Sequence, residues 1–332
     1  MYRFLYIVSL LIHLTACSGP LSTATSAELE STPAPAVSVT PTSLPTIDIY
    51  EQNIHLFDYD AESHVLITEE SVQQEDGYTV HGISYPSPKD GDVPGYLVVP
   101  EGPGPFAGIL LMHGSSGSRS SMLPLAKDLV HTGAVVLTVS APSARLPGRD
   151  WITFTPRDRD EQIQLMLDLR RGVDLLTQHE KVEPSQIGYI GYSYGAAMGG
   201  LLAGLEPRIK AYGLMVGDGG LVNHFTDTEG AMGGFETIDA GARERWLEAM
   251  EPIEPIHYVG HAAPSAIFFQ NAHFDRSVTE EDALAYQAAG SEPKKVQWYE
   301  SGHGLPEQAF VDMVAWLAEQ IGIDVSKFKL SS

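Results

Sequence analysis

The pentapeptide Gly-Tyr-Ser-Tyr-Gly at residues 191–195 constrains this chain more than any other stretch, because it has the form G-x-S-x-G. The apolar run at 186–190 before it is typical of a buried strand, and the small residues at 196–203 after it favour a helix packed close to a sheet. A serine on such a tight strand-to-helix turn exposes its Oγ, and small flanking residues avoid clashes there. The pattern also arises by chance, so we interpret Ser193 as a nucleophile only together with partner residues.

The rest of the folded part alternates short apolar runs with helical patterns. Strands at 64–68, 78–85 and 95–99, separated by Gly, Asp and Pro turns, indicate an antiparallel start. Further patterns predict strands at 106–112, 134–139, 186–190, 209–216, 265–270 and 295–299, and helices at 120–131, 159–179, 196–203 and 306–321. This order predicts the α/β class, with a mostly parallel sheet and helices on both faces.

A Gly-rich and acid-rich insertion occupies residues 218–263, between the sixth and seventh main strands of the predicted sheet. One helix is predicted inside it, near 242–250. Such an insertion is either a long loop or part of a substrate cap. With 43% hydrophobic residues the chain can bury a sizeable core, and we expect 48–332 to form a single domain.

The amino terminus predicts export. A short basic region at 1–3 precedes an apolar run at 4–12, which is too short to span a bilayer comfortably. Leu-Thr-Ala-Cys at 14–17 resembles a bacterial lipobox, in which the signal is cut before the cysteine and the thiol receives the lipid. Cys17 is the only cysteine, so a disulfide within the chain and a cysteine-only metal site are excluded. An ordinary signal peptide with an incidental cysteine is the alternative.

The composition of residues 18–47 predicts a disordered tether. Ser, Thr, Pro and Ala make up 21 of these 30 residues, which leaves too little apolar surface to offset the entropy of ordering. A flexible coil of this length reaches on the order of 30 Å. We therefore expect a globular domain outside the cytoplasm, held at a bacterial membrane by the lipid on Cys17.

The charge balance excludes one class of partner. The formal net charge is −23, and residues 4–88 contain no Lys or Arg, so a nucleic acid would be repelled. The acidic residues form a solvated surface, or alternatively attract a cationic substrate. No pattern indicates a protein partner, and we expect a small-molecule substrate.

Two residues downstream of the pentapeptide complete a candidate catalytic set. A serine hydroxyl needs a histidine to take its proton and a carboxylate to orient that histidine. Asp275 and His303 follow the strands at 265–270 and 295–299, so both fall at the sheet edge where Ser193 emerges. The order Ser193, Asp275, His303 is that of the α/β-hydrolase fold. Asp218, at the end of the preceding strand, is the rival acid.

The tetrahedral intermediate of such a reaction needs hydrogen-bond donors for its oxyanion. These are normally the backbone N–H after the nucleophile and one from the loop after the third main strand. Here they are Tyr194 and Ser115, with Ser116 a near-equal candidate for the second. His113, in the same turn, is predicted to be structural.

One pair of histidines has a spacing that is also found in metal sites. His257 and His261 are four residues apart, as in a helical metal-binding pair. Tyr258, however, occupies the position where the H-E-x-x-H motif needs glutamate, and Gly260 weakens a helix. No metal site is therefore predicted there.

From about residue 78 to 322 the chain resembles an α/β-hydrolase of the dienelactone-hydrolase-like group. The resemblance is carried by His-Gly-Ser-Ser-Gly at 113–117, the pentapeptide at 191–195, Asp275 with Arg-Ser-Val at 276–278, and Gly-His at 302–303. Serine departs from the cysteine nucleophile of true dienelactone hydrolases, which favours carboxylic esters as substrates. The resemblance implies no metal and no organic cofactor.

Three functions are compatible with these residues. In a lipid-anchored serine esterase, Ser193 attacks an ester carbonyl, His303 shuttles the proton, Asp275 orients His303, and water releases the acid. A peptidase or amidase with the same triad is the first alternative, with Glu229 and Glu236 binding a peptide amine. A non-catalytic surface lipoprotein on a hydrolase scaffold is the second.

Three residues in the loop after the strand at 134–139 are candidates for the substrate pocket. They are Trp151, Phe154 and Arg157. They either line the acyl or alcohol pocket or pack against the start of the following helix.

Replacing Cys17 by alanine is expected to abolish incorporation of a fatty acid, because the thiol that receives the lipid is lost. The measurement is metabolic labelling by an alkyne fatty acid in bacteria expressing the full-length wild type or C17A, combined with membrane fractionation of the wild type. An unlabelled wild type, a wild type that does not sediment with membranes, or a C17A protein labelled as strongly as the wild type would contradict the predicted lipidation.

Overall fold

The computed structural model describes residues 48–146, 148, 150–226 and 234–330. The chain divides into two units at residues 46 and 47, and all described residues belong to the second. The predicted signal segment, Cys17, the tether at 18–47 and Glu229 lie outside the described residues. Among the described helices, none is long and apolar enough to span a bilayer.

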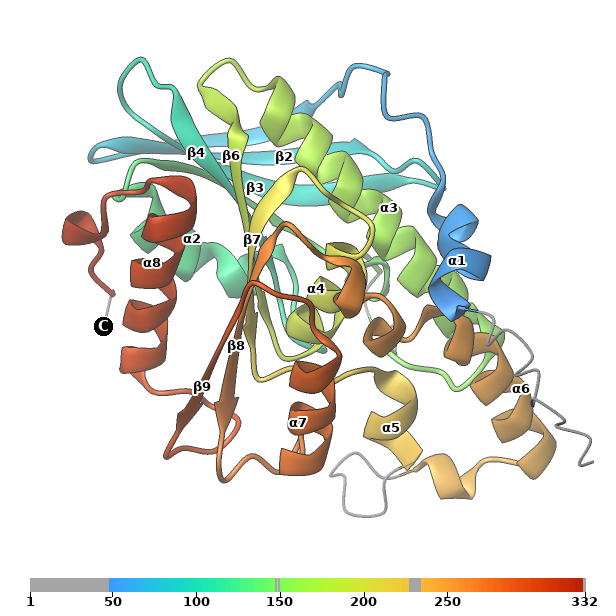
Figure 1. Ribbon diagram of the computed structural model, residues 1–332. Helices are drawn as coiled ribbons and strands as arrows, with labels where there is room; N and C mark the ends of the chain where they lie inside the picture. The colour runs from blue at the N-terminus through green and yellow to red at the C-terminus, as the bar shows by residue number, and fades with distance from the viewer. Residues whose placement is uncertain (1–47, 147, 149, 227–233, 331–332) are drawn as a thin grey trace, which may run out of the picture. The chain divides into compact units, whose positions relative to one another are not determined.

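A nine-stranded sheet forms the middle of the described domain, in the order β1-β2-β3-β5-β4-β6-β7-β8-β9 (Figure 1). The strands are β1 Thr68–Glu75, β2 Tyr78–Pro86, β3 Asp92–Pro100, β4 Phe106–Met112, β5 Ala134–Val139, β6 Val182–Tyr192, β7 Ile209–Met215, β8 Ala266–Ala272 and β9 Lys294–Tyr299. Neighbours from β1 to β5 pair antiparallel, and all pairs from β5 to β9 are parallel. The predicted antiparallel start and mostly parallel sheet are confirmed.

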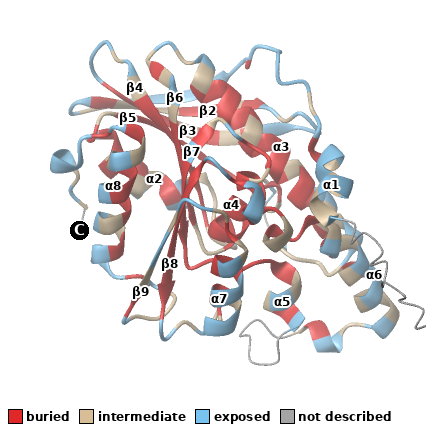
Figure 2. Ribbon diagram, in the orientation of Figure 1, coloured by how far each residue is buried: buried red, intermediate tan, exposed pale blue. Residues whose placement is uncertain are grey.

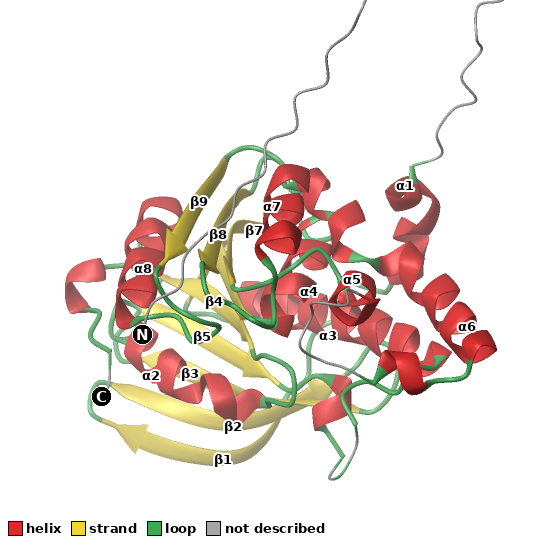
Figure 3. Cartoon of the chain, turned by 90° about the horizontal axis from the view of Figure 1, so that it is seen from below, coloured by secondary structure: helices red, strands yellow, loops and turns green. Residues whose placement is uncertain are grey.

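Helices cover both faces of this sheet (Figure 1, Figure 3). One core cluster contains residues of α2 Leu123–Val130 and α8 Glu307–Ile321, and the other contains residues of α3 Pro156–Gln178, α4 Tyr194–Ala203 and α7 Glu280–Ala289. Successive residues of β4 alternate between them, with Ile109 in the first cluster and Leu110 in the second. Both are fully buried, as the continuous apolar run of β4 predicts. Figure 2 shows that the middle of the sheet is buried.

The prediction of a strand at 64–68 is wrong. Leu66 and Ile67 are 70% and 46% exposed, and the first strand begins only at Thr68. This strand lies at the edge of the sheet, and all its residues except Glu75 are exposed. Because neither face of β1 packs against a core, its polar sequence carries no alternation from which a strand could be predicted.

Several helix boundaries differ from the expectation, and α4 begins at Tyr194, two residues earlier than predicted. The helix predicted at 120–131 is a 3-10 turn at Arg119–Met122 followed by α2. Helix α3 begins at Pro156, three residues early, since Thr155 and Asp158 form a capping box. Three helices were not predicted: α1 Ile49–Asn53, α5 Leu221–Thr226 and α7, which buries few of its residues and shows little helical periodicity.

Residues 48–67 lie against α3, held mainly by two arginines of that helix. Arg170 Nη1 donates to the carbonyl of Phe57 (2.8 Å), and Arg171 Nη1 donates to the carbonyl of Ser63 (2.9 Å). The Phe57 side chain is fully buried beneath this segment. The segment is thereby part of the core although it forms no strand.

The insertion at 218–263 contains two helices and four 3-10 turns among its described residues. These are α5 Leu221–Thr226, α6 Ala240–Met250, and turns at Phe235–Thr237, Glu251–Ile253, Pro255–His257 and Val259–His261. The helix predicted near 242–250 is confirmed. Trp246 of α6 is fully buried against Phe154, Phe225 and Phe235, and its Nε1 donates to Asp158 Oδ2 (2.9 Å). These contacts fasten the insertion to the start of α3.

Glu254 is buried within the insertion. Its carboxylate accepts the backbone N–H groups of Leu221 (3.1 Å) and Val222 (3.0 Å), which open α5. Burial raises the pKa of Glu254 well above its ordinary value despite the hydrogen bond from Val222, and the charge of Asp218 raises it further. The folded protein therefore binds this proton more tightly than the unfolded chain.

Glu254→Gln is expected to flatten the pH dependence of stability. A raised folded-state pKa makes the contribution of Glu254 complete below its ordinary pKa of 4.5 and lost as the pH rises above it. The amide has only one acceptor oxygen, so the variant also loses one hydrogen bond, about 1 kcal/mol. The melting temperature between pH 5 and 8 measures the slope, with exposed Glu248→Gln as the control. Equal slopes in E254Q and wild type would contradict this assignment.

Candidate active site

The turn at 191–195 has the strand-turn-helix geometry that its sequence predicts. Strand β6 ends at Tyr192 and α4 begins at Tyr194, which leaves Ser193 alone at the turn with φ 53° and ψ −118°. A non-glycine residue at positive φ costs on the order of 1–3 kcal/mol and persists only where its surroundings hold it. Here the Ser193 N–H donates to the carbonyl of Met215 at 2.8 Å, which ties the turn to the neighbouring strand β7.

The two glycines of the pentapeptide allow this turn. A Cβ at Gly191 would lie 2.1 Å from the carbonyl oxygen of Gly195, and a Cβ at Gly195 would lie 2.4 Å from that of Met112. Both atoms are backbone, so neither can move aside without displacing α4 or β4. The backbone of the turn therefore approaches its neighbours as closely as only glycine permits.

His303 lies between Ser193 and Asp275. Its Nε2 is 2.9 Å from Ser193 Oγ and its Nδ1 is 2.8 Å from Asp275 Oδ2. The Asp275 side chain is 2% exposed, and its Oδ1 accepts the N–H groups of Ser277 (2.8 Å) and Val278 (3.1 Å). A carboxylate at Nδ1 selects the tautomer with the hydrogen there, which leaves Nε2 as the acceptor of a hydrogen bond from the Ser193 hydroxyl. The structure thus brings together three residues that lie up to 110 positions apart.

Asp218, the rival acid, has a different partner. Its Oδ2 lies 3.0 Å from Nδ1 of His224, in α5, rather than beside His303. His224 was not among the residues predicted for the site. No motif surrounds it, and the only signal is its position shortly after an acid at a strand end.

The two residues predicted to donate to the oxyanion both line a cavity beside Ser193. Tyr194 is the first residue of α4, where backbone N–H groups have no partner within the helix. Ser115 lies in the turn after β4, followed by Ser116 at φ 59°. Their role toward an oxyanion stays a prediction.

His113 stabilises this turn. Its Nε2 accepts the N–H of Ala141 (3.1 Å), so its Nδ1 carries the proton and donates to the carbonyl of Gly114 (2.7 Å). Burial lowers its pKa, although the bond to Gly114 opposes the shift. A neutral, buried His113 thus joins the loops after β4 and β5, which is the structural role that the sequence predicts.

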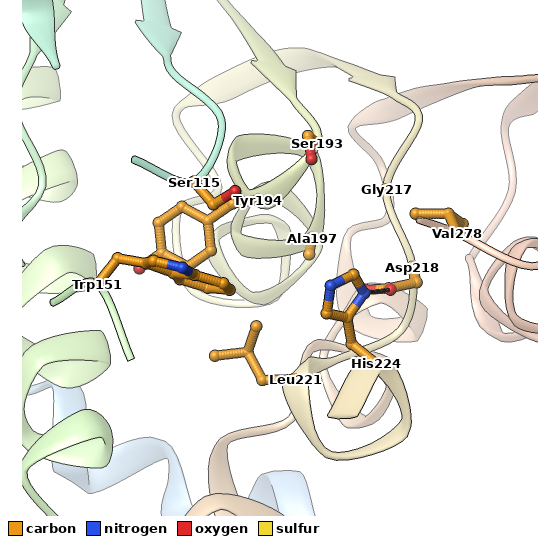
Figure 4. A pocket seen from close by; sticks show the side chains of 10 residues that line it. All are labelled: Ser115, Trp151, Ser193, Tyr194, Ala197, Gly217, Asp218, Leu221, His224 and Val278. Atoms are coloured by element: carbon orange, nitrogen blue, oxygen red, sulfur yellow. Dashed lines mark hydrogen bonds and ion pairs between the residues drawn. The ribbon is translucent and has the colours of Figure 1, made fainter. Parts of the chain in front are cut away.

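A narrow cavity opens beside Ser193 (Figure 4). The volume in which the centre of a water molecule can lie is about 20 Å³, so the cavity has room for one or two water molecules. It is lined by Ser115, Trp151, Ser193, Tyr194, Ala197, Gly217, Asp218, Leu221, His224 and Val278. The insertion therefore supplies part of the wall, whereas His303 and Asp275 do not line it.

Trp151, Phe154 and Arg157, the three pocket candidates, lie apart in the structure, and Arg157 belongs to α3 rather than to the loop before it. Trp151 lines the cavity and packs edge to face against Tyr194, with ring centroids 5.9 Å apart. Phe154 packs against Trp246 of the insertion, and Arg157 pairs with Glu161 at 2.5 Å. Only Trp151 of the three faces the cavity.

The remaining polar candidates lie elsewhere. His257 pairs with Glu251 at 3.1 Å, and His261 stacks on Tyr50 with ring centroids 3.7 Å apart. Glu236 is exposed in the turn at Phe235–Thr237. Within the described part of the chain, no group of three His, Cys, Asp or Glu residues is placed to hold a metal ion.

Comparison with known proteins identifies the fold. No protein-family model matches this sequence, and neither does any curated protein. An acetyl xylan esterase from a Paenibacillus species superposes with a TM-score of 0.68 at 17% identity, covering 84% of this chain and 96% of that one. An acetyl xylan esterase from a Thermoanaerobacterium species has a TM-score of 0.64 at 13% identity, covering 85% and 93%.

A Klebsiella pneumoniae protein described as a dienelactone hydrolase is also similar, with a TM-score of 0.52 at 15% identity. The match covers 77% of this chain and 100% of that one. At these identities the likeness establishes the architecture. The chain has the α/β-hydrolase fold that the motifs predict.

Gly191→Ala is expected to destabilise the domain by several kcal/mol, because the added methyl group overlaps the backbone of α4. Gly304→Ala is the matched control, since a Cβ there has no heavy atom within 4 Å and lies in the same region of the site. The measurement is the urea midpoint of both variants. A G191A midpoint equal to that of G304A would show that the close approach at the turn is not a constraint.

Proposed function

We propose that this protein is a serine hydrolase that cleaves carboxylic esters with small acyl groups. The observation that carries the proposal is the continuous hydrogen-bonded chain from Ser193 Oγ through His303 to Asp275. The strained turn supports it, because a serine Oγ exposed at such a turn suits a nucleophile. The solved structures with the same fold include acetyl xylan esterases, which favours an ester as the substrate.

The proposed reaction begins when Ser193 Oγ attacks the ester carbonyl carbon and passes its proton to His303 Nε2. Asp275 stabilises the resulting imidazolium, and the N–H groups of Tyr194 and Ser115 donate to the oxyanion. The intermediate collapses as Nε2–H protonates the departing alcohol. A water molecule, deprotonated by His303, then attacks the acyl-enzyme, releases the acid and returns the proton to Ser193.

We propose that the cavity receives the acyl group of the ester, and its position relative to His303 supports this. The departing alcohol must face His303, which delivers its proton. His303 does not line the cavity, whereas Ser115 and Tyr194 do, so the cavity receives the part of the ester on the other side of the carbonyl. A volume of about 20 Å³ fits an acyl group with one or two non-hydrogen atoms beyond the carbonyl carbon. Longer chains would meet Leu221 and Trp151.

Ser193→Ala is expected to abolish hydrolysis of p-nitrophenyl acetate, and Asp275→Asn to lower kcat by about 10⁴-fold through the wrong histidine tautomer. Ser185→Ala, an exposed serine of the same strand, is the matched control. The soluble domain is assayed with a chain-length series of p-nitrophenyl esters. We expect kcat/KM for the acetate to exceed that for the hexanoate by at least about tenfold, because the longer chain cannot be buried.

The same assay separates the alternatives. A wild-type domain that hydrolyses no ester and whose Ser193 is not labelled by a fluorophosphonate would overturn the proposed function. Turnover of aminoacyl amides above that of esters would favour the peptidase alternative instead.

We also propose that the protein is exported and anchored by lipid on Cys17. The lipobox-like sequence at 14–17 and the composition of 18–47 support this. The C17A labelling experiment tests it independently of catalysis.

A further inference from the structure

His224 and Asp218 form a second histidine–carboxylate pair, and both side chains line the cavity beside Ser193. The side chains of His224 and Asp218 are 14% and 5% exposed and form a hydrogen bond of 3.0 Å. The proposed triad uses neither of them. Burying two ionisable side chains in a small cavity costs solvation free energy and does not stabilise the fold. We therefore expect the pair to bind a ligand.

The pair is rigidly placed. Asp218 follows β7 directly after Gly217, where a Cβ would lie 2.6 Å from Ala196 of α4, so the backbone runs close to the helix that carries Ser193. Glu254 holds the start of α5, and His224 lies on that helix. Asp218 therefore fixes Nδ1 of an imidazole whose helix is itself anchored.

The other ring nitrogen of His224, Nε2, faces the cavity. Figure 4 shows that the ring edge opposite Asp218 points into the cavity. Among the described residues, Nε2 has no hydrogen-bond partner, whereas Nδ1 is bonded to Asp218. Nε2 is therefore accessible to a water molecule or to a polar group of the substrate.

The charge around His224 decides what Nε2 offers. Burial lowers its pKa, but the hydrogen bond and charge of Asp218, with Asp282 of α7 and Asp275 of the loop after β8, raise it above the usual value. In the imidazolium form Nε2–H donates a hydrogen bond. In the neutral form, with Nδ1–H donating to Asp218, Nε2 accepts one. A hydroxyl group satisfies both forms because it donates and accepts.

We propose that His224 is a specificity-determining residue that binds an oxygen on the carbon next to the reacting carbonyl, so that α-hydroxyacyl esters are preferred over alkanoyl esters of equal size. This rests on the proposed function, which places the acyl group in the cavity. An acetyl group leaves Nε2 to a water molecule. The methyl end of a propionyl group displaces that water without replacing its hydrogen bond, whereas a glycolyl hydroxyl replaces it.

The experiment compares glycolyl and propionyl esters of one alcohol, which have the same number of non-hydrogen atoms. The ratio of their kcat/KM values is measured for wild type, His224→Leu and His224→Gln. Dividing the variant ratio by the wild-type ratio cancels the intrinsic reactivity of the two esters. We expect H224L to lower the ratio about tenfold, the effect of one lost hydrogen bond of about 1.4 kcal/mol. We expect H224Q to retain most of it, because its amide still donates and accepts.

His257→Leu is the matched control. His257 is also paired with a carboxylate, Glu251, and lies in the same insertion, but it does not line the cavity. The glycolyl-to-propionyl ratio of H257L is expected to equal that of wild type. Labelling of Ser193 by a fluorophosphonate reports whether each variant retains a folded site.

A ratio that is unchanged in a labelled H224L protein would overturn the proposal while leaving the esterase intact. If H224L is not labelled, His224→Phe takes its place, since phenylalanine keeps a planar ring and has no Nε2, and an unchanged ratio in labelled H224F has the same meaning. Failure of the proposed function looks different, since the wild type would then hydrolyse neither ester and Ser193 would not be labelled.

Discussion

The close contact between the end of β6 and the first turn of α4 sets the position of everything else in the site. Gly191 and Gly195 let the backbone of the turn approach the backbone of α4 and β4 so closely that a Cβ at either position would overlap a carbonyl oxygen. Ser193 is thereby held at positive φ, and its amide is bonded to β7 rather than to its own helix. The strain at this residue is offset by the sheet and helix on either side, which is why the elbow needs a large buried core around it.

The site itself is assembled from loops at the carboxyl ends of neighbouring parallel strands. Ser193 follows β6, Asp218 follows β7, Asp275 follows β8 and His303 follows β9, so four chemically active residues meet along one edge of the sheet. Two histidine–carboxylate pairs result from this order. One extends to the Ser193 oxygen, and the other closes the cavity beside it through a helix of the insertion. The same topology thus serves proposed catalysis and proposed selectivity with separate residues.

Much of this was predictable because the relevant signals are local. Strands such as β4 are buried on both faces and therefore have continuous apolar sequences, and the elbow has its two glycines. The edge strand β1 was not predicted because neither of its faces packs against a core. The apolar Leu66 and Ile67 just before it were interpreted as a strand, although both are exposed. Helix α7 escaped because its few buried residues leave only a weak period. His224 had no surrounding motif, since its importance comes from a residue six positions away and from the cavity that it faces.

The sequence by itself determined the class of fold, the turn that presents Ser193 and the order of the serine, acid and histidine. These depend on short-range sterics and on the period of apolar residues, which are written along the chain. Only the tertiary structure decided which acid pairs with which histidine, that Trp151 rather than Phe154 faces the cavity, and that the cavity is small. Those outcomes depend on distances between segments far apart in the chain. The packing of helices and of the insertion on the sheet sets those distances, and no local pattern encodes them.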